Sequence, residues 1–341
     1  MSYKRSYQPQ WIREDFIDFI AEKVNPIWAW KKVKAQVIHI ECIGTDFYQI
    51  QLRPNSNFKY PQFQAGQSLL VTLTIEGIRN QRSYSVLKLL SNGDLIIAVK
   101  QQGHVSKALT QLPISAVVEL SQTQGDFVLN HRADAILLLA SGSGITAIYA
   151  LLQQAMLLHN IQKIDLIYFS RDQAFVEELT QLAEAHQHFN FYHFNTSKQR
   201  QRFSKALLTR LVPDFGQRET YLCGANRLMV AVNDLYQTLG IAQHLKQEFF
   251  QHISDENASQ QPVYFQRSQQ NFDASSNLLE SAEQAGLRPA HGCRMGICNS
   301  CSCTKVSGSV KNLLTGEINH ADQTQIKLCI SQAISPVVIN L

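Results

Sequence analysis

The sequence predicts three folded units in series: an antiparallel β-barrel, an α/β domain with a parallel sheet, and a small α+β domain. Its 341 residues suffice for two or three domains that each bury a core. Short β-branched segments broken by Gly, Pro or Asn are followed by strand-like runs that alternate with helical stretches. The changes of pattern predict an N-terminal helical extension at 1–34, the barrel at 35–130, the α/β domain at 131–250, a polar linker at 251–261, and the last domain at 262–341.

Composition excludes several classes of function. The net charge of +4 is small, and no block of Lys or Arg exceeds two residues, so we expect no nucleic-acid partner. No run approaches the ~20 apolar residues of a membrane span, and the start of the chain lacks a signal peptide. We therefore expect a cytoplasmic protein. Thiols stay reduced there, so clustered cysteines indicate metal binding or catalysis rather than disulfides.

The N-terminal extension holds all three tryptophans and seven Lys/Arg against four Asp/Glu. The stretch "WIREDFIDFIAEKV" places Ile12, Phe16, Phe19 and Ile20 on one helical face. An apolar helical stripe is usually core, which predicts a helix packed by this face onto the next domain. The alternative is a basic, Trp-bearing helix that rests on a membrane surface.

Two motifs in the predicted barrel have the chemistry of a nucleotide-like ligand site. "RSYSV" follows the strand "GQSLLVTLTI", and "VKQQGHVSKAL" begins one strand later. An arginine offers a bidentate cation to phosphate, a tyrosine a flat face for an aromatic ring, and a serine a hydrogen bond to a ring nitrogen. Amides at the start of the second helix could hold a pyrophosphate. The candidate residues are Arg82, Ser83, Tyr84, Ser85, Gly103, His104, Val105 and Ser106.

The α/β domain begins with a strand, a glycine turn and a helix, "AILLLASGSGITAIYALL". It lacks the GxGxxG fingerprint, but Gly142 and Gly144 would allow close backbone approach, and the helix from Ile145 and Thr146 presents amides to a phosphate. After the next strand, Ser170 and Arg171 stand where a 2'-phosphate could be gripped, which favours NADPH over NADH. Histidines nearby are expected at the surface: His186, His188 and His193.

The cysteine loop "HGCRMGICNSCSC" predicts an iron–sulfur site. Cys293, Cys298 and Cys301 have the spacing CxxxxCxxC, and Cys329 follows after 27 intervening residues, as in plant-type [2Fe-2S] proteins. A single zinc ion is the main rival, but structural zinc sites usually pair two CxxC-like knuckles. Cys303 could replace Cys301 as a ligand, although we expect a small buried residue. Cys42 is expected to be structural.

The flanks of this loop resemble a known module. "SSNLLESAEQAGLRPAHGCRMGICNSC", "SGSVKNLLTGE" and "KLCISQ" are similar to the C-terminal ferredoxin domain of modular iron–sulfur flavoprotein reductases, over nearly all of 262–341. The resemblance implies a β-grasp fold and a [2Fe-2S] cluster on the four ligands named above. Ser275 or Ser276 would cap the helix that carries "NLLESAEQA".

The upstream motifs resemble the ferredoxin-NADP reductase superfamily. The resemblance assigns Arg82 to flavin phosphates, Tyr84 to stacking on the isoalloxazine, Ser85 to its N5 edge, and Gly103 to Ser106 to the pyrophosphate. The shapes of "GHVSKAL" and "QGDFVL" favour FAD over FMN.

The same resemblance extends to the α/β domain. It makes "GSGIT" the nicotinamide-dinucleotide turn and places Cys223 and Gly224 beside the nicotinamide. Ala147 and Ala225 stand where proline is usual in this family, a mild departure that leaves the backbone amides in place.

These resemblances imply an NAD(P)H oxidoreductase that passes electrons from the nucleotide through flavin to the cluster and on to a partner protein. Ser85 and Cys223 would lie at the reacting rings. "VNPIWAWKKVKAQVI" resembles the extension of reductases that serve membrane-bound di-iron acyl-CoA desaturases and hydroxylases, which implies such an acceptor and a peripheral membrane contact through residues 1–34. The alternatives are a soluble ring-hydroxylating oxygenase or monooxygenase as acceptor, and a flavin reductase regulated by a redox-sensing or zinc-binding C-terminal domain.

Overall fold

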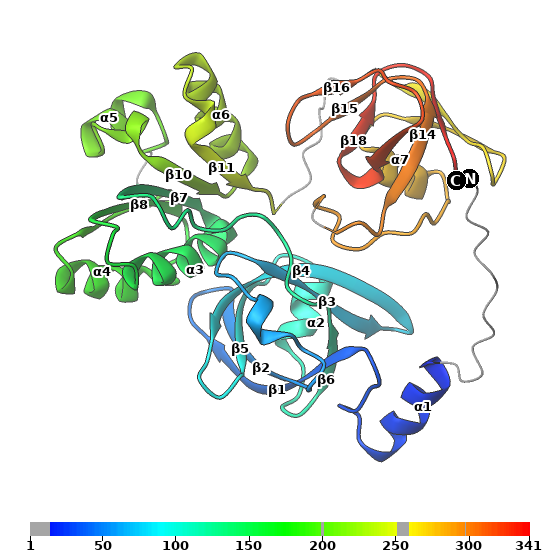
Figure 1. The fold of residues 1–341 in the computed structure, drawn as a ribbon, viewed down its shortest axis with the longest axis horizontal. Coiled ribbons are helices and arrows are strands. Elements are labelled where there is room, and N and C mark those ends of the chain that lie inside the picture. The colour runs from blue at the N-terminus through cyan, green and yellow to red at the C-terminus, as the bar shows by residue number, and fades with distance from the viewer. Residues whose placement is uncertain (1–13, 199–200, 251–258, 297) are drawn as a thin grey trace.

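The computed structural model describes residues 14–198, 201–250, 259–296 and 298–341. The expected place of Ile12 on the helical face, the side chain of Phe16 and most of the linker lie outside the described residues. Figure 1 shows the barrel below, the α/β domain on one side of it and the C-terminal domain on the other. Among the described residues no helix is long and apolar enough to cross a membrane.

The first unit is a closed six-stranded antiparallel barrel, as the sequence predicts. Its strands follow the order β1-β2-β5-β4-β3-β6, and alternate side chains fill its interior. The short helix α2 (His104–Thr110) follows β5. The strands are β1 (Val33–Cys42), β2 (Phe47–Pro54), β3 (Ser68–Ile75), β4 (Ile78–Leu89), β5 (Leu95–Lys100) and β6 (Val117–Leu120).

Strand β4 is the one strand of the barrel that we did not predict from the sequence. "RSYS" lies in the middle of this twelve-residue strand, although we placed it only after a strand. Its first half is polar, so neither an apolar run nor a clean alternation marks it. Cross-strand pairing sets Tyr84 opposite Leu69 and Ser83 opposite Leu70 of β3.

The second unit is a five-stranded parallel sheet in the order β11-β10-β7-β8-β9. Helices α3 and α4 cover one face and α5 and α6 the other, each over its own apolar core, which confirms the predicted arrangement (Figure 1). The elements are β7 (Ala135–Ser141), α3 (Ile145–Met156), β8 (Lys163–Ser170), α4 (Val176–Ala185), β9 (Phe189–Asn195), α5 (Lys205–Leu211), β10 (Glu219–Cys223), α6 (Asn226–Thr238) and β11 (Leu245–Glu248).

The C-terminal unit packs helix α7 (Leu278–Gln284) against a five-stranded sheet, with a second three-stranded sheet beside it. Asn277 caps α7 by accepting a hydrogen bond from the Glu280 amide at 2.9 Å, so the predicted cap at Ser275 or Ser276 is wrong. The Ser276 hydroxyl instead lies 3.2 Å from that of Ser281. The strands are β12 (Gln261–Phe265), β13 (Gln270–Ala274), β14 (Ser302–Ser307), β15 (Val310–Asn312), β16 (Ile318–Asn319), β17 (Thr324–Lys327), β18 (Ser331–Ala333) and β19 (Val337–Ile339).

Helix α1 (Glu14–Val24) lies at the edge of the barrel and does not pack as we expected (Figure 1). Phe19 and Ile20, which we placed against the barrel, are exposed. Asp18 is buried in their place, because it accepts a hydrogen bond from the Trp30 amide and pairs with Lys32. The helix is thus attached through its polar side.

Candidate functional site

Two cavities of similar size adjoin along the seam between the three units. The first measures about 660 Å³ and the second about 650 Å³, both in the range of ligand pockets. Lys100, Gln102 and Ser143 line both, so the two spaces share a wall. The first cavity also reaches the cysteine loop, where Cys293, Arg294 and Met295 line it.

The first cavity collects all eight residues that the sequence singled out in the barrel. They come from the middle of β4 and from the first turn of α2. Thr146 of α3 joins them, although we assigned it to the nucleotide site. The residues are Arg82, Ser83, Tyr84, Ser85, Gly103, His104, Val105 and Ser106.

The lining of this cavity fits a flat ring that carries hydrogen-bonding atoms. The hydroxyls of Ser83 and Ser85 are buried and have no hydrogen-bond partner among the described residues, which is costly unless a ligand supplies one. Burial raises the pKa of Tyr84 to about 12, so its ring is a neutral phenol at neutral pH. Burial, and then the nearby Arg294, lowers the pKa of Arg82.

The start of α2 offers fewer amides than we expected. Ser106 Oγ accepts hydrogen bonds from the amides of Gln102 and Gly103, both at 3.0 Å, and donates to the Gly103 carbonyl at 2.9 Å. The Ser106 hydroxyl therefore caps its own helix and occupies the Gly103 amide, one of the amides that we assigned to a pyrophosphate.

The second cavity lies over the carboxyl ends of the parallel strands, where α/β sheets commonly bind nucleotides. It is lined by Gly142, Ser170, Arg171 and Gly224 of the predicted set. Gly142 has a φ of 54°, and among the described residues no atom lies within 4 Å of the position that a Cβ would take there. Two further arginines, Arg202 and Arg227, also line it. Sequence reasoning missed them because isolated arginines on polar segments are usually only solvated.

Gly144, Ile145 and Cys223 line neither cavity. Ile145 and Cys223 are fully buried in the core of the α/β domain. A Cβ on Gly144 would lie 2.1 Å from the Cys223 carbonyl oxygen, so this glycine lets the first loop of the sheet rest on the loop after β10. Gly224 has the same role, since its Cβ would lie 2.2 Å from Ser141 Oγ.

A buried acid beside these loops also escaped sequence reasoning. Glu248 pairs with Cys223 across β10 and β11, and its Oε2 has no hydrogen-bond partner among the described residues. Burial raises the pKa of Glu248 to about 8 and raises that of the Cys223 thiol well above its usual value. Glu248 therefore holds a proton at neutral pH. Phe250, two residues on, lines the first cavity.

The four predicted ligand cysteines form two pairs. Cys301 Sγ lies 3.3 Å from Cys329 Sγ. In the other pair, the amide of Cys293 donates to Cys298 Sγ and the amide of Cys298 donates to Cys293 Sγ, each at 3.2 Å. A hydrogen bond from the partner thiol lowers the pKa of Cys298 to about 4 and that of Cys301 to about 6. One thiol of each pair is therefore a thiolate at neutral pH.

The pairing fits a two-iron cluster better than one zinc ion. A [2Fe-2S] cluster held by four thiolates takes two on each iron, whereas tetrahedral zinc draws its ligands to one point. In the described part of the chain no three Cys, His, Asp or Glu side chains converge closely enough to hold a single ion. The predicted bystander Cys303 is buried in the core of the domain and takes part in neither cysteine pair.

The loop around the cysteines is closely fitted. A Cβ at Gly292 would lie 2.9 Å from Cys298 Sγ, and one at Gly296, whose φ is 77°, would lie 3.0 Å from Ile330. The amide of Met295 donates to Cys293 Sγ at 3.4 Å. Amide donors of this kind tune the cluster that the sulfurs bind.

The cysteine loop rests on the barrel beside the first cavity. Leu70 of β3 packs with Cys293, Cys298 and Met295 in a small apolar cluster. Leu70 is paired with Ser83 of β4, which lines the first cavity, so the barrel contacts the loop directly beside that cavity. Long-range contacts of this kind have no signal in the sequence.

Two other expectations need correction. Cys42, which we took as structural, is exposed at the end of β1. His193 is half-buried rather than at the surface, and its Nε2 lies 2.9 Å from Ser170 Oγ.

Fold and site together define a three-domain protein with adjoining sites for two large ligands and a cysteine-bound cluster. The family model for an oxidoreductase FAD-binding domain matches residues 34–129, and that for an oxidoreductase NAD-binding domain matches 138–234. The model for a 2Fe-2S iron-sulfur cluster binding domain matches 263–333.

Similar proteins cover nearly the whole chain. An "NADPH oxidoreductase" of Mycobacterium tuberculosis is 28% identical over 93% of this chain and 86% of its own length. The phthalate dioxygenase reductase of Burkholderia cepacia is 25% identical over 90% of this chain and 96% of its own. A solved structure of phthalate dioxygenase reductase shares the fold, with a TM-score of 0.62 at 24% identity over 91% of this chain and 98% of that one.

The chain belongs to the ferredoxin-NADP reductase family of flavoproteins and carries a C-terminal [2Fe-2S] ferredoxin domain. It is an NAD(P)H oxidoreductase whose cofactors are FAD and a [2Fe-2S] cluster, as we expected from the sequence. Its function is electron transfer from NAD(P)H through these cofactors, like that of oxygenase reductase components.

Proposed function

We propose that this reductase takes electrons from NADPH in preference to NADH and delivers them to a membrane-bound di-iron fatty acyl desaturase or hydroxylase. The relay rests on one observation: the two cavities share Lys100, Gln102 and Ser143, and the first of them ends on Cys293 and Met295. Bound NADPH supplies two electrons together, and the flavin and cluster pass them on singly.

The residues of the first cavity would hold FAD. Arg82 faces its phosphates with a bidentate guanidinium, and Tyr84 offers a flat neutral ring for the isoalloxazine. Ser85, whose hydroxyl has no hydrogen-bond partner among the described residues, would offer that hydroxyl to the N5 edge of the ring. Leu70 and Met295 pack against Cys293 and Cys298 beside this site.

The cysteine pairs would hold the cluster, with Cys293 and Cys298 on one iron and Cys301 and Cys329 on the other. The nucleotide would occupy the second cavity, with its phosphates against Gly142 and Ser143 and its nicotinamide towards Gly224.

The preference for NADPH is supported by positive charge in the second cavity. Arg171, Arg202 and Arg227 line it together with Ser170, and NADPH differs from NADH by a phosphate that such groups bind well. Arg171→Gln and Arg202→Gln should each lower kcat/KM for NADPH about tenfold to a hundredfold, because a charge-assisted hydrogen bond contributes ~1.5–3 kcal/mol. The value for NADH should hardly change.

Arg210→Gln is the matched control, because Arg210 is an exposed residue of α5 that lies outside the cavity lining. Equal losses with NADH and NADPH in the Arg171 and Arg202 variants would contradict the proposed preference.

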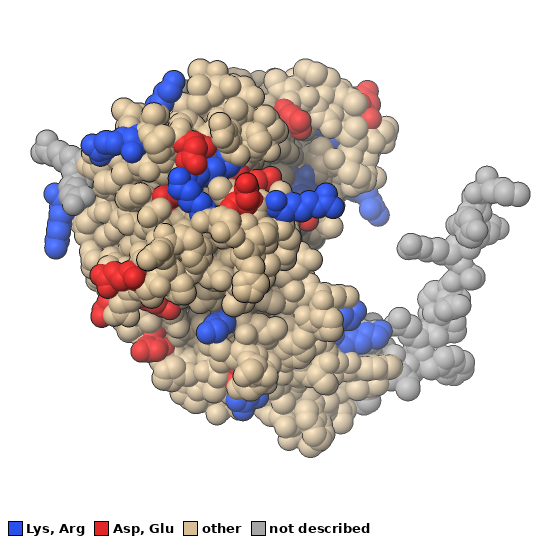
Figure 2. Space-filling view, turned by 60° about the vertical axis from the view of Figure 1, so that its left-hand side comes forward, with Lys and Arg blue, Asp and Glu red and all other residues tan. Residues whose placement is uncertain are grey.

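The choice of a membrane acceptor rests on the N-terminal segment, whose resemblance to desaturase reductases and exposed aromatic residues favour it. A second candidate is a soluble oxygenase, because similar proteins are named phthalate dioxygenase reductase and glycine betaine monooxygenase reductase subunit. On the face in Figure 2, basic and acidic side chains are dispersed in small groups, which favours neither acceptor.

Reconstitution distinguishes the two acceptors. The holoprotein with NADPH should support oxygen-dependent desaturation by membranes that contain a desaturase, and should not support turnover by a soluble oxygenase component. Deletion of residues 1–30 should reduce the first activity. Turnover with only the soluble oxygenase would refute the membrane acceptor.

A further inference from the structure

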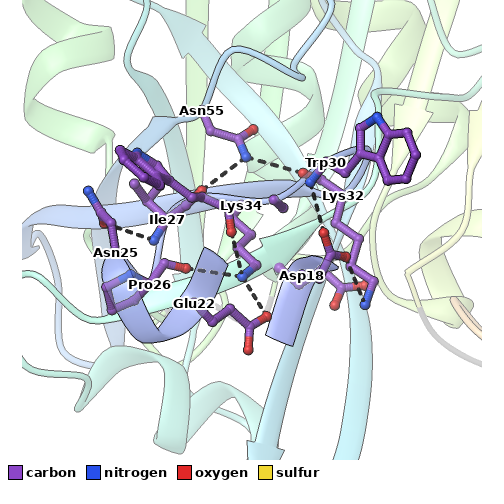
Figure 3. Close-up of polar contacts among 12 residues, drawn as sticks. Asp18, Glu22, Asn25, Pro26, Ile27, Trp30, Lys32, Lys34 and Asn55 are labelled. Atoms are coloured by element: carbon purple, nitrogen blue, oxygen red, sulfur yellow. Dashed lines mark hydrogen bonds and ion pairs between the residues drawn. The ribbon is translucent and has the colours of Figure 1, made fainter. Parts of the chain in front are cut away.

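Helix α1 is attached to the barrel by polar contacts (Figure 3). Asp18, only 3% exposed, accepts the Trp30 amide at 2.8 Å and pairs with Lys32 Nζ at 3.3 Å. The described side chains of α1 belong to none of the apolar cores of the three domains. A surface helix usually buries its apolar side, so this attachment is the reverse of the normal one.

A buried lysine fixes the segment that follows the helix. Lys34, at the start of β1, donates to Glu22 Oε1 at 2.6 Å and to the carbonyls of Pro26 and Trp28, both at 3.1 Å (Figure 3). A buried ammonium requires such acceptors, so these contacts hold the turn after α1 in one orientation.

Two asparagines complete the attachment. The amide of Asn55 donates to the carbonyls of Ile27 and Lys32, and that of Asn57 to the carbonyls of Ala29 and Lys32, at 3.0–3.1 Å. The backbone of residues 25–32 is thereby pinned to the barrel, and its large side chains are held outward.

Five large apolar side chains of α1 and of this segment are exposed. None of these five side chains belongs to an apolar core. Five large exposed apolar residues within twelve positions are more than the single, scattered ones normal for a protein surface. We call them the aromatic face: Phe19 (56% exposed), Ile20 (48%), Val24 (70%), Trp28 (55%) and Trp30 (48%).

The described charged side chains that lie over rings of the aromatic face are cationic. Lys23 lies over the Phe19 ring at 5.4 Å and Lys31 over the Trp30 ring at 5.5 Å. The described acidic groups of the helix point the other way, because Asp18 is buried and Glu22 engages Lys34.

We propose that the aromatic face is a docking surface for an anionic lipid bilayer. Trp side chains favour the membrane interface, and lysines beside them are attracted to anionic headgroups. A second copy of the chain would bring like charges together, which opposes self-association through this face. The proposal goes beyond the electron relay, because it assigns a location to the reductase whatever its acceptor.

The position of α1 suits this role. It lies at the edge of the barrel away from the α/β domain (Figure 1), and none of its described residues lines either cavity. A bilayer at the aromatic face therefore leaves the nucleotide cavity open to solvent.

Vesicle binding by the holoprotein tests the proposal. All three tryptophans lie in residues 1–34, so intrinsic tryptophan emission reports on this segment alone. In a Trp11→Phe background the emission of Trp28 and Trp30 should shift to the blue on addition of phosphatidylcholine vesicles that contain phosphatidylglycerol, and binding should weaken as salt is raised. Pure phosphatidylcholine should bind far less.

Variants locate the surface. Trp28→Ala with Trp30→Ala should reduce co-sedimentation with the anionic vesicles at least tenfold, and Lys23→Gln about fivefold, since one lysine near an anionic surface contributes ~1 kcal/mol. Leu157→Ala is the control, because Leu157 is 73% exposed at the end of α3, in another domain. Its binding should equal that of the wild type.

Reduction of ferricyanide by NADPH shows that each variant is folded, and should be unchanged in all of them. The proposal is overturned if the wild type does not bind anionic vesicles, or if the double tryptophan variant binds as well as the wild type. It is equally overturned if neutral vesicles bind as strongly, or if loss of the tryptophans abolishes a dimer rather than vesicle binding.

Discussion

Glu248 offers the sharpest prediction about the core beside the nucleotide site. The residue is only 6% exposed, and its Oε2 has no hydrogen-bond partner among the described residues. Burial raises its pKa from 4.5 to about 8. Glu248→Gln keeps the shape of the side chain and removes the titrating proton.

The sign of the effect follows from the raised pKa. The folded protein holds a proton that the unfolded chain releases, so the free energy of unfolding falls as pH rises from the unfolded pKa towards the folded one. With a raise from 4.5 to about 8 and ~1.4 kcal/mol per unit, this loss is about 1 kcal/mol at pH 5 and about 3 kcal/mol at pH 7. A glutamine at this position does not titrate, so the variant does not show this loss of stability. Burying its amide has a cost, but that cost does not depend on pH.

Urea unfolding of the holoprotein, read by pulse proteolysis of the α/β domain, measures the difference between Glu248→Gln and the wild type. The free energy of unfolding of the variant, minus that of the wild type, should increase by about 2 kcal/mol as pH is raised from 5 to 7. A difference that stays constant over this range, or that moves in favour of glutamate, would refute the argument from burial.

Three further substitutions test the cavities and the barrel. Gly144→Ala, whose Cβ would lie 2.1 Å from the Cys223 carbonyl, should lower kcat/KM at least tenfold for both nucleotides. Gly292→Ala, with its Cβ 2.9 Å from Cys298 Sγ, should lose most of the iron and retain the flavin. Asp94→Asn should destabilise the barrel by ~1 kcal/mol, because it breaks an ion pair with Arg53, whose side chain is half-exposed and therefore screened by solvent. The Arg53 hydrogen bond lowers the pKa of Asp94, so in the wild type this contribution is lost as pH falls from about 4 through the lowered pKa.

Gly216→Ala is the control for both glycine variants, because its Cβ would meet only Ile241 at an ordinary 3.6 Å. Normal nucleotide kinetics in Gly144→Ala, or full iron content in Gly292→Ala, would show that the loops can move aside. For Asp94→Asn, an unchanged urea midpoint would disprove the stabilising role of the pair.

The sequence was sufficient where function depends on local motifs. The spacing of Cys293, Cys298 and Cys301 and the motif "RSYS" mark candidate sites because these residues lie within a few positions of one another, and the structure collects all eight barrel residues in one cavity. The strands were recognised wherever β-branched residues dominate. Strand β4 was not, because its polar residues serve the cavity rather than the core.

Features that depend on tertiary contacts could not be predicted. The packing of Leu70 on the cysteine loop and the burial of Glu248 join segments far apart in the chain. The N-terminal helix shows the limit of periodicity: Phe19 and Ile20 of the predicted apolar stripe are exposed, whereas Asp18 is buried. Hydrophobic periodicity identifies the apolar face of a helix but does not show which part of the protein packs against that face.

Anaerobic stopped-flow reduction by NADPH tests the relay most directly, because flavin and cluster absorb differently in the visible range. Both should be reduced completely, with the flavin first and the cluster after it, and in Gly292→Ala the flavin alone should be reduced. Reduction of the cluster before the flavin, or a cluster that stays oxidised beside fully reduced flavin, would contradict the path from the shared cavity wall to Cys293.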